Sequence, residues 1–252
     1  MQVVIIGSGN VATVLGRVLV KNNHKVLQVV SRHPEHAKTL ADELGCTYCD
    51  MDGSINTGAD IYIVAISDGA LYGMHTKLKL GKKLIVHTAG SVPLEVLKDV
   101  SENYGVLYPL QSLRGELNDI KEIPFLIDGN TVETFTLVQD FAKSISSMVV
   151  KATDEERLKL HVAAVVVSNF SNHLFALAEE FCQKEHVNFK LLTPLILETA
   201  QRTATHSPAN MQTGPAMRND VFTLDKHLRL LTNHQKLRYI YLKLTDSILR
   251  ES

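Results

Sequence analysis

The sequence has little cysteine and no excess of charge of either sign. Its 252 residues include three cysteines and 26 basic against 27 acidic residues, which gives a formal net charge of −1. An odd, small number of cysteines argues against a disulfide scaffold and for a reducing compartment. Because a balanced charge does not attract polyanions, we do not expect nucleic acid as a partner.

A complete set of zinc ligands is also missing from the motifs of the sequence. Cys46 and Cys49 form a C-x-x-C motif, which is typical of a redox pair or of half a zinc site. The sequence has no second C-x-x-C motif to complete such a site. We therefore interpret both cysteines as small apolar residues of a short strand and predict no metal site.

Targeting and membrane signals are absent from the sequence pattern. The N-terminus, MQVVIIGSGN, lacks the basic segment of a secretory signal and is better explained as a first strand. No purely apolar run approaches the ~20 residues that a membrane helix needs. The expectation is a cytoplasmic protein that does not associate with a membrane.

Strands and helices alternate through roughly the first 150 residues, which indicates βαβ units and a parallel sheet. Continuous apolar runs such as 2–7 and 59–66 suit strands that are buried on both faces of a parallel sheet. Other strands are expected at 25–30, 46–49, 82–90, 104–109, 123–129 and 147–152, and helices at 10–21, 34–44, 68–78, 93–99 and 131–145. This order predicts an α/β Rossmann domain with a mostly parallel sheet.

The pattern changes near Thr153, after which no strand is predicted. Asp154 is expected to cap a long helix that runs to about Lys184. Further helices fit 188–204, 222–231 and 234–250, with a loop at 206–220. The prediction is an NADP-binding Rossmann domain at 1–152 followed by an all-α C-terminal domain at 153–252.

A glycine-rich turn, G-x-G-x-x-A, closes the first strand and opens an amphipathic helix. In this context the motif indicates dinucleotide binding, because the glycines permit a tight turn and a close approach of the pyrophosphate to backbone amides. A purely structural turn is the alternative. The predicted cofactor-binding residues of the turn are Gly7, Ser8, Gly9, Asn10, Val11 and Ala12.

The end of the second strand indicates which dinucleotide binds. NAD sites usually have a carboxylate there, whereas this strand ends with Ser31 and Arg32. Ser31 can donate to a 2′-phosphate and Arg32 can pair with it. The prediction is NADP (NADPH) rather than NAD, with a surface role for Arg32 as the alternative.

Ligands of open α/β sheets lie at the carboxyl ends of the strands. Asp68 could line this edge or cap a helix, and His87 could be an acid–base residue or a hydrogen-bonded structural histidine. The further residues that we expect to line the nicotinamide end of the cleft are Ala65, Ile66, Ser67, Thr88 and Gly90.

A polar stripe crosses the apolar helix that opens the second domain. On a regular helix, Ser168 and Asn172 lie within about 20° of His161, and Asn169 lies about 80° away. The stripe could contact substrate and nicotinamide, or it could form a hydrogen-bond network between helices or subunits. Lys159 lies about 200° from His161 on such a helix, which excludes it from the same site.

The loop at 213–220 contains Arg218 among turn residues. Arg218 could hold a substrate carboxylate, or it could pair with Asp220 and fix the loop.

The chain resembles a family of Rossmann-like proteins with a helical C-terminal domain of unknown function, whose members are named as deazaflavin-coenzyme-dependent NADP oxidoreductases. The wider group contains pyrroline-5-carboxylate reductase, ketopantoate reductase and β-hydroxyacid dehydrogenases. The motifs that carry the resemblance are IIGSGNVA at 5–12, HTAGS at 87–91, YPLQS at 108–112, HVAAVVVSN at 161–169 and TGPAMRND at 213–220.

This resemblance implies a nucleotide at Gly7–Ala12 and a homodimer formed through the helical domain. It also implies a cleft lined by His87–Ser91, Tyr108–Ser112, His161, Asn169 and Thr213–Asp220. It does not imply the catalytic arrangement of the β-hydroxyacid dehydrogenases. Those enzymes have Asn four residues after a catalytic Lys, whereas the residue four positions after Lys159 is Ala163 here. No residue set in the sequence requires a deazaflavin.

We expect an NADP(H)-dependent oxidoreductase that acts on a small carbonyl, imine or hydroxy/amino acid. The expected catalytic residues are His161 as proton donor or acceptor, Ser168, Asn169 and His87, with Arg218 orienting an anionic substrate. The alternative is a non-catalytic NADP(H)-binding sensor or interaction module. A Rossmann methyltransferase is disfavoured, because it usually has an acid where Ser31 and Arg32 stand.

Overall fold

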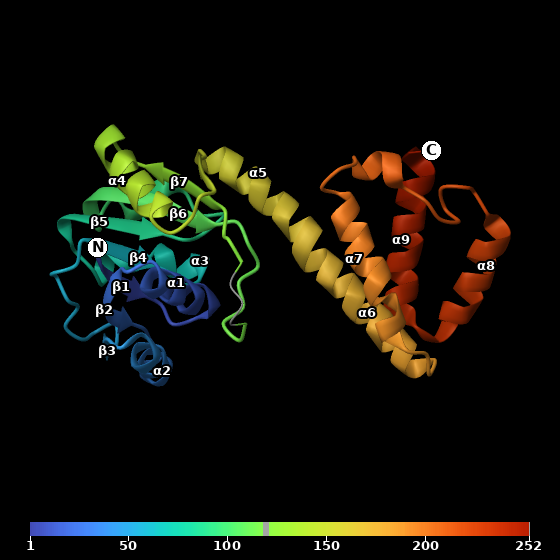
Figure 1. The fold of residues 1–252 in the computed structure, drawn as a ribbon, viewed down its shortest axis with the longest axis horizontal. Helices are drawn as coiled ribbons and strands as arrows, with labels where there is room; N and C mark the ends of the chain where they lie inside the picture. The colour runs from blue at the N-terminus through green and yellow to red at the C-terminus, as the bar shows by residue number, and fades with distance from the viewer. Residues whose placement is uncertain (118–120, 252) are drawn as a thin grey trace. The chain divides into compact units, whose positions relative to one another are not determined.

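The computed structural model describes residues 1–117 and 121–251, which fall into two compact units, Met1–Ser168 and Asn169–Ser252 (Figure 1). The last strand of the first unit ends at Lys151, and the long helix α5 begins at Asp154. The change to all-helical structure therefore lies where the sequence predicted it. The first compact unit continues to Ser168, and the domain boundary at 152/153 remains a prediction.

Within the described residues, eight strands form one sheet in the order β3-β2-β1-β4-β5-β6-β7-β8. All neighbouring pairs are parallel except β6 and β7. The fold is thus the mostly parallel Rossmann sheet that was expected. The strands are β1 (Gln2–Ile6), β2 (Lys25–Val30), β3 (Thr47–Cys49), β4 (Ile61–Val64), β5 (Gly81–His87), β6 (Ser101–Pro109), β7 (Phe125–Gly129) and β8 (Val149–Lys151).

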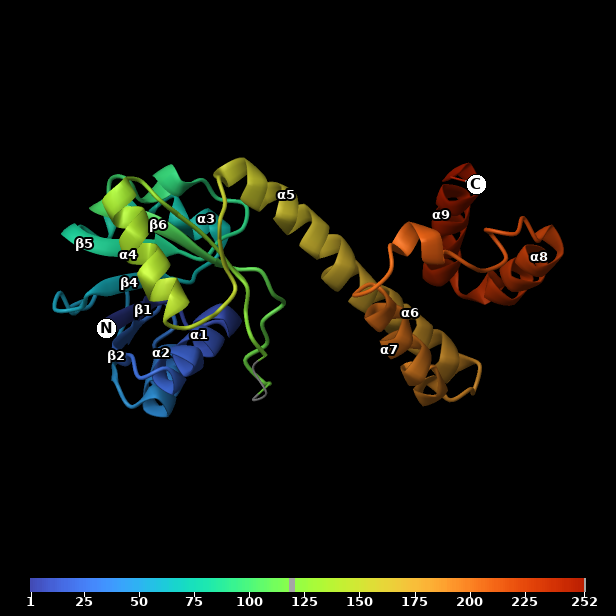
Figure 2. The same cartoon turned by 45° about the horizontal axis from the view of Figure 1, so that its top comes forward.

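Helices cover both faces of this sheet (Figure 2). α1 (Asn10–Lys21), α2 (Pro34–Leu44) and α4 (Val132–Lys143) share one buried apolar cluster with alternate strand residues such as Val3 and Ile5. The intervening residues, such as Val4 and Ile6, pack on the other face with α3 (Asp68–Leu71). Because both faces are covered, every residue of β1 and β4 except Gln2 is apolar or aromatic and buried.

Two predicted helices of the first unit are shorter than expected. The segment 68–78 contains α3 and a separate 3-10 turn at Met74–Thr76, divided at Gly73, which weakens a helix because of its conformational freedom. The segment 93–99 forms only a 3-10 helix at Leu94–Leu97.

The long helix consists of α5 (Asp154–Ala164), a π-helical segment at Val165–Phe170 and α6 (Ser171–Lys184). Its N-cap is Thr153, whose hydroxyl and the Glu156 carboxylate form a capping box. The expectation that Asp154 caps the helix was therefore wrong. The carboxylate of Asp154 instead accepts hydrogen bonds from the Leu94 amide, at 3.0 and 3.2 Å.

By length and composition, the 31-residue helix Asp154–Lys184 could span a membrane. Its most apolar 18-residue window has a mean hydropathy of 1.3, and 6% of that window is buried. One such helix does not by itself identify a membrane protein, so the absence of membrane association remains a prediction.

In its described residues, the second unit contains helices, 3-10 turns and loops, and no strand. After α6 it contains α7 (Thr193–Arg202), α8 (Val221–Leu230) and α9 (Gln235–Glu251), with 3-10 turns at Phe189–Leu192, Pro208–Met211 and Leu231–Asn233. α6 and α9 are in contact, and His234 joins them through a hydrogen bond of 2.7 Å to Glu185. Large apolar side chains nevertheless remain on the surface of this unit, including Leu191, Leu195 and Phe222.

Candidate functional site

A cleft of about 1040 Å³ opens at the carboxyl ends of the strands. It lies where β1 and β4 are neighbours, and from this point the chain continues to β2 on one side and to β5 on the other. Such a reversal of strand order is where open α/β sheets bind ligands. Loops after five strands, together with Tyr108 of β6 and His161 of α5, line the cleft.

The glycine turn forms one wall of this cleft. Gly7 has a φ of 126°, which disfavours any residue with a side chain, and a Cβ there would lie 2.0 Å from the carbonyl oxygen of Ala65. A Cβ on Gly9 would meet no atom within 4 Å, so the backbone of Gly9 faces open space in the cleft. Ala12 is fully buried against the sheet and does not line the cleft.

Asn10 has a structural contact that the sequence did not suggest. Its side-chain oxygen accepts a hydrogen bond from the Gly115 amide at 3.1 Å. Arg17, two turns later on α1, donates to the Gly115 carbonyl at 2.6 Å. These two contacts attach the loop that follows β6 to the helix that carries the glycine turn.

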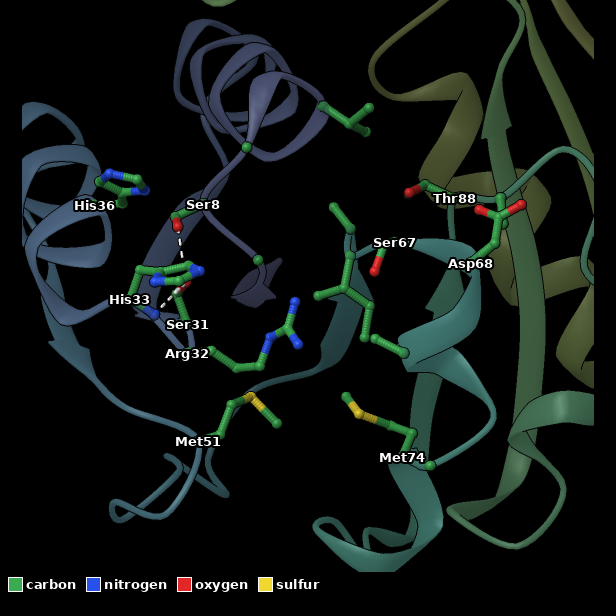
Figure 3. A pocket seen from close by; sticks show the side chains of 18 of the residues that line it. Ser8, Ser31, Arg32, His33, His36, Met51, Ser67, Asp68, Met74 and Thr88 are labelled. Carbon is green, nitrogen blue, oxygen red and sulfur yellow. Dashed lines mark hydrogen bonds between the residues drawn. The ribbon is translucent and has the colours of Figure 1, made fainter.

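The residues that follow β2 bring the Ser31 hydroxyl and the Arg32 guanidinium to the cleft, beside the Ser8 hydroxyl of the glycine turn. Ser8 donates a hydrogen bond of 2.8 Å to the Ser31 hydroxyl, which also accepts from the His33 amide at 3.2 Å (Figure 3). The Arg32 side chain extends into the cleft beside them (Figure 3). Arg32 is therefore accessible to an anionic group within the cleft, whereas Ser31 lines the cleft but is only 7% exposed.

Two methionines that sequence reasoning missed line the same part of the cleft. Met51 follows β3, Met74 follows α3, and their side chains extend into the cleft from opposite walls (Figure 3). Polarizable thioethers suit contact with an aromatic ring, such as a nucleotide base. No residue spacing in the sequence pairs these two positions, because they meet only through the order of the strands.

The loops after β4 and β5 form the remaining wall. Ala65, Ile66, Ser67, Thr88 and Gly90 all line the cleft, as do Gly7, Ser8, Gly9, Asn10 and Val11. Asp68 is the first residue of α3, and its carboxylate accepts a hydrogen bond from Ser91. This contact joins α3 to the loop after β5.

His161 reaches the cleft from α5. Its Nδ1 atom lies 2.8 Å from the Tyr108 hydroxyl, and both side chains line the cleft. A Cβ on Gly90 would fall 2.7 Å from this nitrogen and 3.0 Å from Cζ of Tyr108. The missing side chain of Gly90 therefore makes the space in which this pair lies.

The same side of α5 carries a buried cation that sequence reasoning missed. The Arg157 side chain is 1% exposed and donates to the Val92 carbonyl and, at 2.8 Å, to the Asp154 carboxylate. Arg157 precedes His161 by four residues, the spacing of neighbours on one helix face. This i, i+4 relation was the signal that could have found it.

His87 is a correction to the expected catalytic set. It has no exposed surface and does not line the cleft, so it cannot contact a ligand there. The Ala89 amide donates to its Nδ1 at 3.2 Å. Burial, followed by the positive charge of Arg157, lowers the pKa of His87 to about 4, which keeps the ring neutral near pH 7.

The other predicted catalytic residues lie farther along the chain. Ser168 belongs to the π-helical segment, whose wider turns invalidate the angle of about 20° that a regular helix predicted between it and His161. Asn169 and Arg218 belong to the second unit, so their relation to the cleft stays a prediction. Lys159 pairs with Glu155 at the surface.

The Asp220 carboxylate caps α8 by accepting hydrogen bonds from the backbone amide and the hydroxyl of Thr223, at 3.0 and 2.7 Å.

Cys46 and Cys49 are free thiols, and burial raises the pKa of both. In the described part of the chain, no group of three or more His, Cys, Asp or Glu side chains could hold a metal.

Comparison with known families agrees with this geometry. The family model described as NADP oxidoreductase coenzyme F420-dependent matches residues 2–90, and that of a domain of unknown function, DUF2520, matches residues 123–248. A proposed NADP oxidoreductase from Bacteroides fragilis is 36% identical, with a TM-score of 0.93 over 99% of this chain and 98% of that chain. The chain belongs to the DUF2520 family of NADP oxidoreductases.

More distant structures share the fold of this DUF2520 protein. The 1-pyrroline-5-carboxylate reductase of Streptococcus pyogenes is 17% identical, with a TM-score of 0.64 over 99% of this chain and 98% of that chain. The imine reductase of Myxococcus stipitatus, in complex with NADP+, is 14% identical, with a TM-score of 0.64 over 99% and 92%. No curated protein matches the sequence.

The cleft of this DUF2520 protein fits a nicotinamide dinucleotide. Open space over the Gly9 backbone leaves room for a diphosphate, and the first turn of α1 presents amides toward anions. Arg32 supplies positive charge to the cleft, and the Tyr108–His161 pair, which lines the same cleft, supplies groups that can carry a proton.

Proposed function

We propose that this protein is an NADP(H)-dependent oxidoreductase that transfers hydride between the nicotinamide and a small carbonyl, imine, or hydroxy or amino acid. The observation that carries the proposal is the composition of one continuous cleft. It begins at the open backbone of Gly9, includes Arg32, and also holds the imidazole of His161. A hydride transfer to a carbonyl or imine needs both a dinucleotide and a proton donor.

Each part of the chain would have a distinct task. The amides around Gly9 would hold the diphosphate, and Arg32 with Ser31 would hold the 2′-phosphate, which favours NADP(H) over NAD(H). The bound cofactor supplies the hydride. His161 would exchange a proton with the substrate heteroatom, because its ring lies at the cleft surface.

The substrate partners remain the ones that the sequence suggested. Ser168 and Asn169 would bind polar groups of the substrate, and Arg218 would pair with its carboxylate. An anionic keto or imino acid would offer a polar group to Ser168 and Asn169 and a carboxylate to Arg218.

The experiment is a thermal-shift and calorimetric comparison of NADPH and NADH, followed by NADPH oxidation assays with keto acids and cyclic imines. A ligand that binds the native state raises its melting temperature. We expect a larger shift with NADPH and turnover that His161→Gln abolishes, while NADPH binding is retained. Binding of NADPH without turnover of any carbonyl or imine would favour a sensor, and no binding of either cofactor would refute the proposal.

We also propose a homodimer formed through the helical unit. Large apolar side chains on this unit are strongly exposed in a single chain, with Leu191 at 76% and Phe222 at 71%. Monomeric soluble proteins rarely leave such side chains in contiguous patches. Light scattering on the purified protein should give twice the chain mass of 27.9 kDa, and Leu191→Glu should reduce it toward that of one chain.

A further inference from the structure

Tyr108 and His161 form a hydrogen-bonded pair whose geometry the backbone below it restricts. Their rings are edge-on, with centroids 5.8 Å apart and planes at 78°. The two rings lie so close to the backbone of Gly90 that no side chain fits there, since a Cβ on Gly90 would fall 2.7 Å from Nδ1 of His161. The hydrogen bond and this close backbone contact together hold the imidazole in one orientation.

We propose that Tyr108 is a positioning residue that anchors His161 through Nδ1 and leaves Nε2 as the atom that exchanges a proton in the cleft. This inference rests on the proposed function of the same site. Among the described residues, the structure gives His161 a hydrogen bond at Nδ1 and none at Nε2.

The choice of a hydroxyl as the anchoring group has a chemical consequence. A phenol can donate to an unprotonated Nδ1 when the imidazole is neutral, and it can accept from Nδ1–H when the ring is an imidazolium. A carboxylate in its place would favour the imidazolium, and a backbone carbonyl could only accept. Tyr108 therefore holds the ring in both protonation states, as a residue that gives and regains a proton requires.

Burial supports the donor role of Tyr108 toward neutral His161. Desolvation raises the pKa of the phenol, against a smaller opposing effect of the Arg157 charge, so the hydroxyl keeps its proton at neutral pH. With the phenol proton directed at Nδ1, the neutral ring carries its own proton on Nε2.

The test is a long-range ¹H–¹⁵N correlation spectrum of protein labelled with [¹⁵N]histidine, recorded at pH 8. His161→Gln identifies the two ring nitrogens. We expect wild-type His161 to show one acceptor-type Nδ1 and one protonated Nε2. In Tyr108→Phe both resonances should move toward the average of the two tautomers. Tyr104→Phe is the matched control, because Tyr104 lies on the same strand and bonds Glu95 instead.

Identical His161 resonances in wild type and Tyr108→Phe would overturn the inference. If Tyr108→Phe does not fold, Gly90→Ala serves instead, since the added methyl group must displace the ring and should give the same shift toward averaged resonances. An unchanged spectrum there would also overturn it. NADPH titrated into the same wild-type sample separates the two proposals: absence of binding refutes the oxidoreductase, and unchanged resonances in the variants refute only the anchoring.

Discussion

Gly7 and Ala65 are in direct contact where β1 and β4 end, and a Cβ on Gly7 would lie 2.0 Å from the Ala65 carbonyl oxygen. Together with the positive φ of Gly7, this contact requires glycine for the fold itself. Gly9, two residues later, has free space where its Cβ would be. The two glycines of one motif therefore serve different purposes, one internal to the chain and one directed at a ligand.

This difference predicts opposite outcomes for two similar substitutions. Gly7→Ala should lower the free energy of unfolding by about 2 kcal/mol or more, because it combines backbone strain with a backbone clash. Gly9→Ala should leave the free energy of unfolding nearly unchanged. It should weaken NADPH binding by about tenfold or more, which is about 1.4 kcal/mol of binding free energy, because the added methyl group prevents the close approach of the diphosphate to the backbone. Urea denaturation and calorimetric titration measure the two quantities. Equal effects of both substitutions on stability would contradict this assignment.

Replacement of Arg32 tests the choice of dinucleotide. Arg32→Gln should raise the Kd for NADPH by about 10- to 100-fold, the loss expected for a charge-assisted contact, and should change the Kd for NADH little. Arg229→Gln is a suitable control, because Arg229 pairs with Asp225 on the surface of the helical unit. Tighter binding of NADH than NADPH by the wild type would count against the roles of Ser31 and Arg32.

Buried His87 predicts that stability decreases in mild acid. Its pKa is about 4 in the folded protein against an ordinary value of 6.5, so the unfolded chain binds more protons between these values. Its contribution to stability is therefore complete above pH 6.5, falls as the pH decreases, and is lost below pH 4. Between pH 7.5 and 5.0 this amounts to about 2 kcal/mol.

The measurement is the free energy of unfolding in urea at both pH values. In His87→Asn, whose side-chain oxygen can accept from the Ala89 amide as Nδ1 does, the decrease on acidification should be about 2 kcal/mol smaller. Other histidines contribute equally to both proteins and cancel. The same decrease in wild type and variant would show that His87 is not held neutral by the fold.

Arg157 should affect both the stability of the first unit and the titration of His87. Arg157→Met should lower the free energy of unfolding by about 1–3 kcal/mol, since it removes hydrogen bonds to Val92 and Asp154. It should also raise the pKa of His87, because the positive charge that opposes protonation is gone. Arg157→Lys, which keeps the charge, should shift that pKa less. NMR titration of the His87 ring would detect the difference, and an unchanged pKa in Arg157→Met would refute the coupling.

The alternation of apolar runs and amphipathic segments was enough to predict the sheet, because a strand buried on both faces has a distinctive sequence. The glycine turn was also readable, because its two glycines lie only two positions apart and directly follow a buried strand. The long helix was predicted in extent, but its cap was not, although Thr153 with Glu156 three residues later has the T-x-x-E pattern of a capping box.

The contacts within the site were less predictable, because they join residues that are distant in sequence. Tyr108 and His161 are 53 residues apart, and no periodicity connects them. The polar stripe was extended toward the C-terminus, to Ser168, when its buried member Arg157 lay toward the N-terminus. The angle between His161 and Ser168 assumed a regular helix, and a pattern of apolar residues does not reveal the wider turns of the π-helical segment.

The attachment of Gly115 to α1 makes a single amide an indicator of loop position. Its proton is shared with the side chain of Asn10, so it exchanges slowly with solvent only while the loop after β6 remains on the helix. Hydrogen–deuterium exchange at that amide, with and without a nucleotide, would report how tightly this segment is held near the glycine turn.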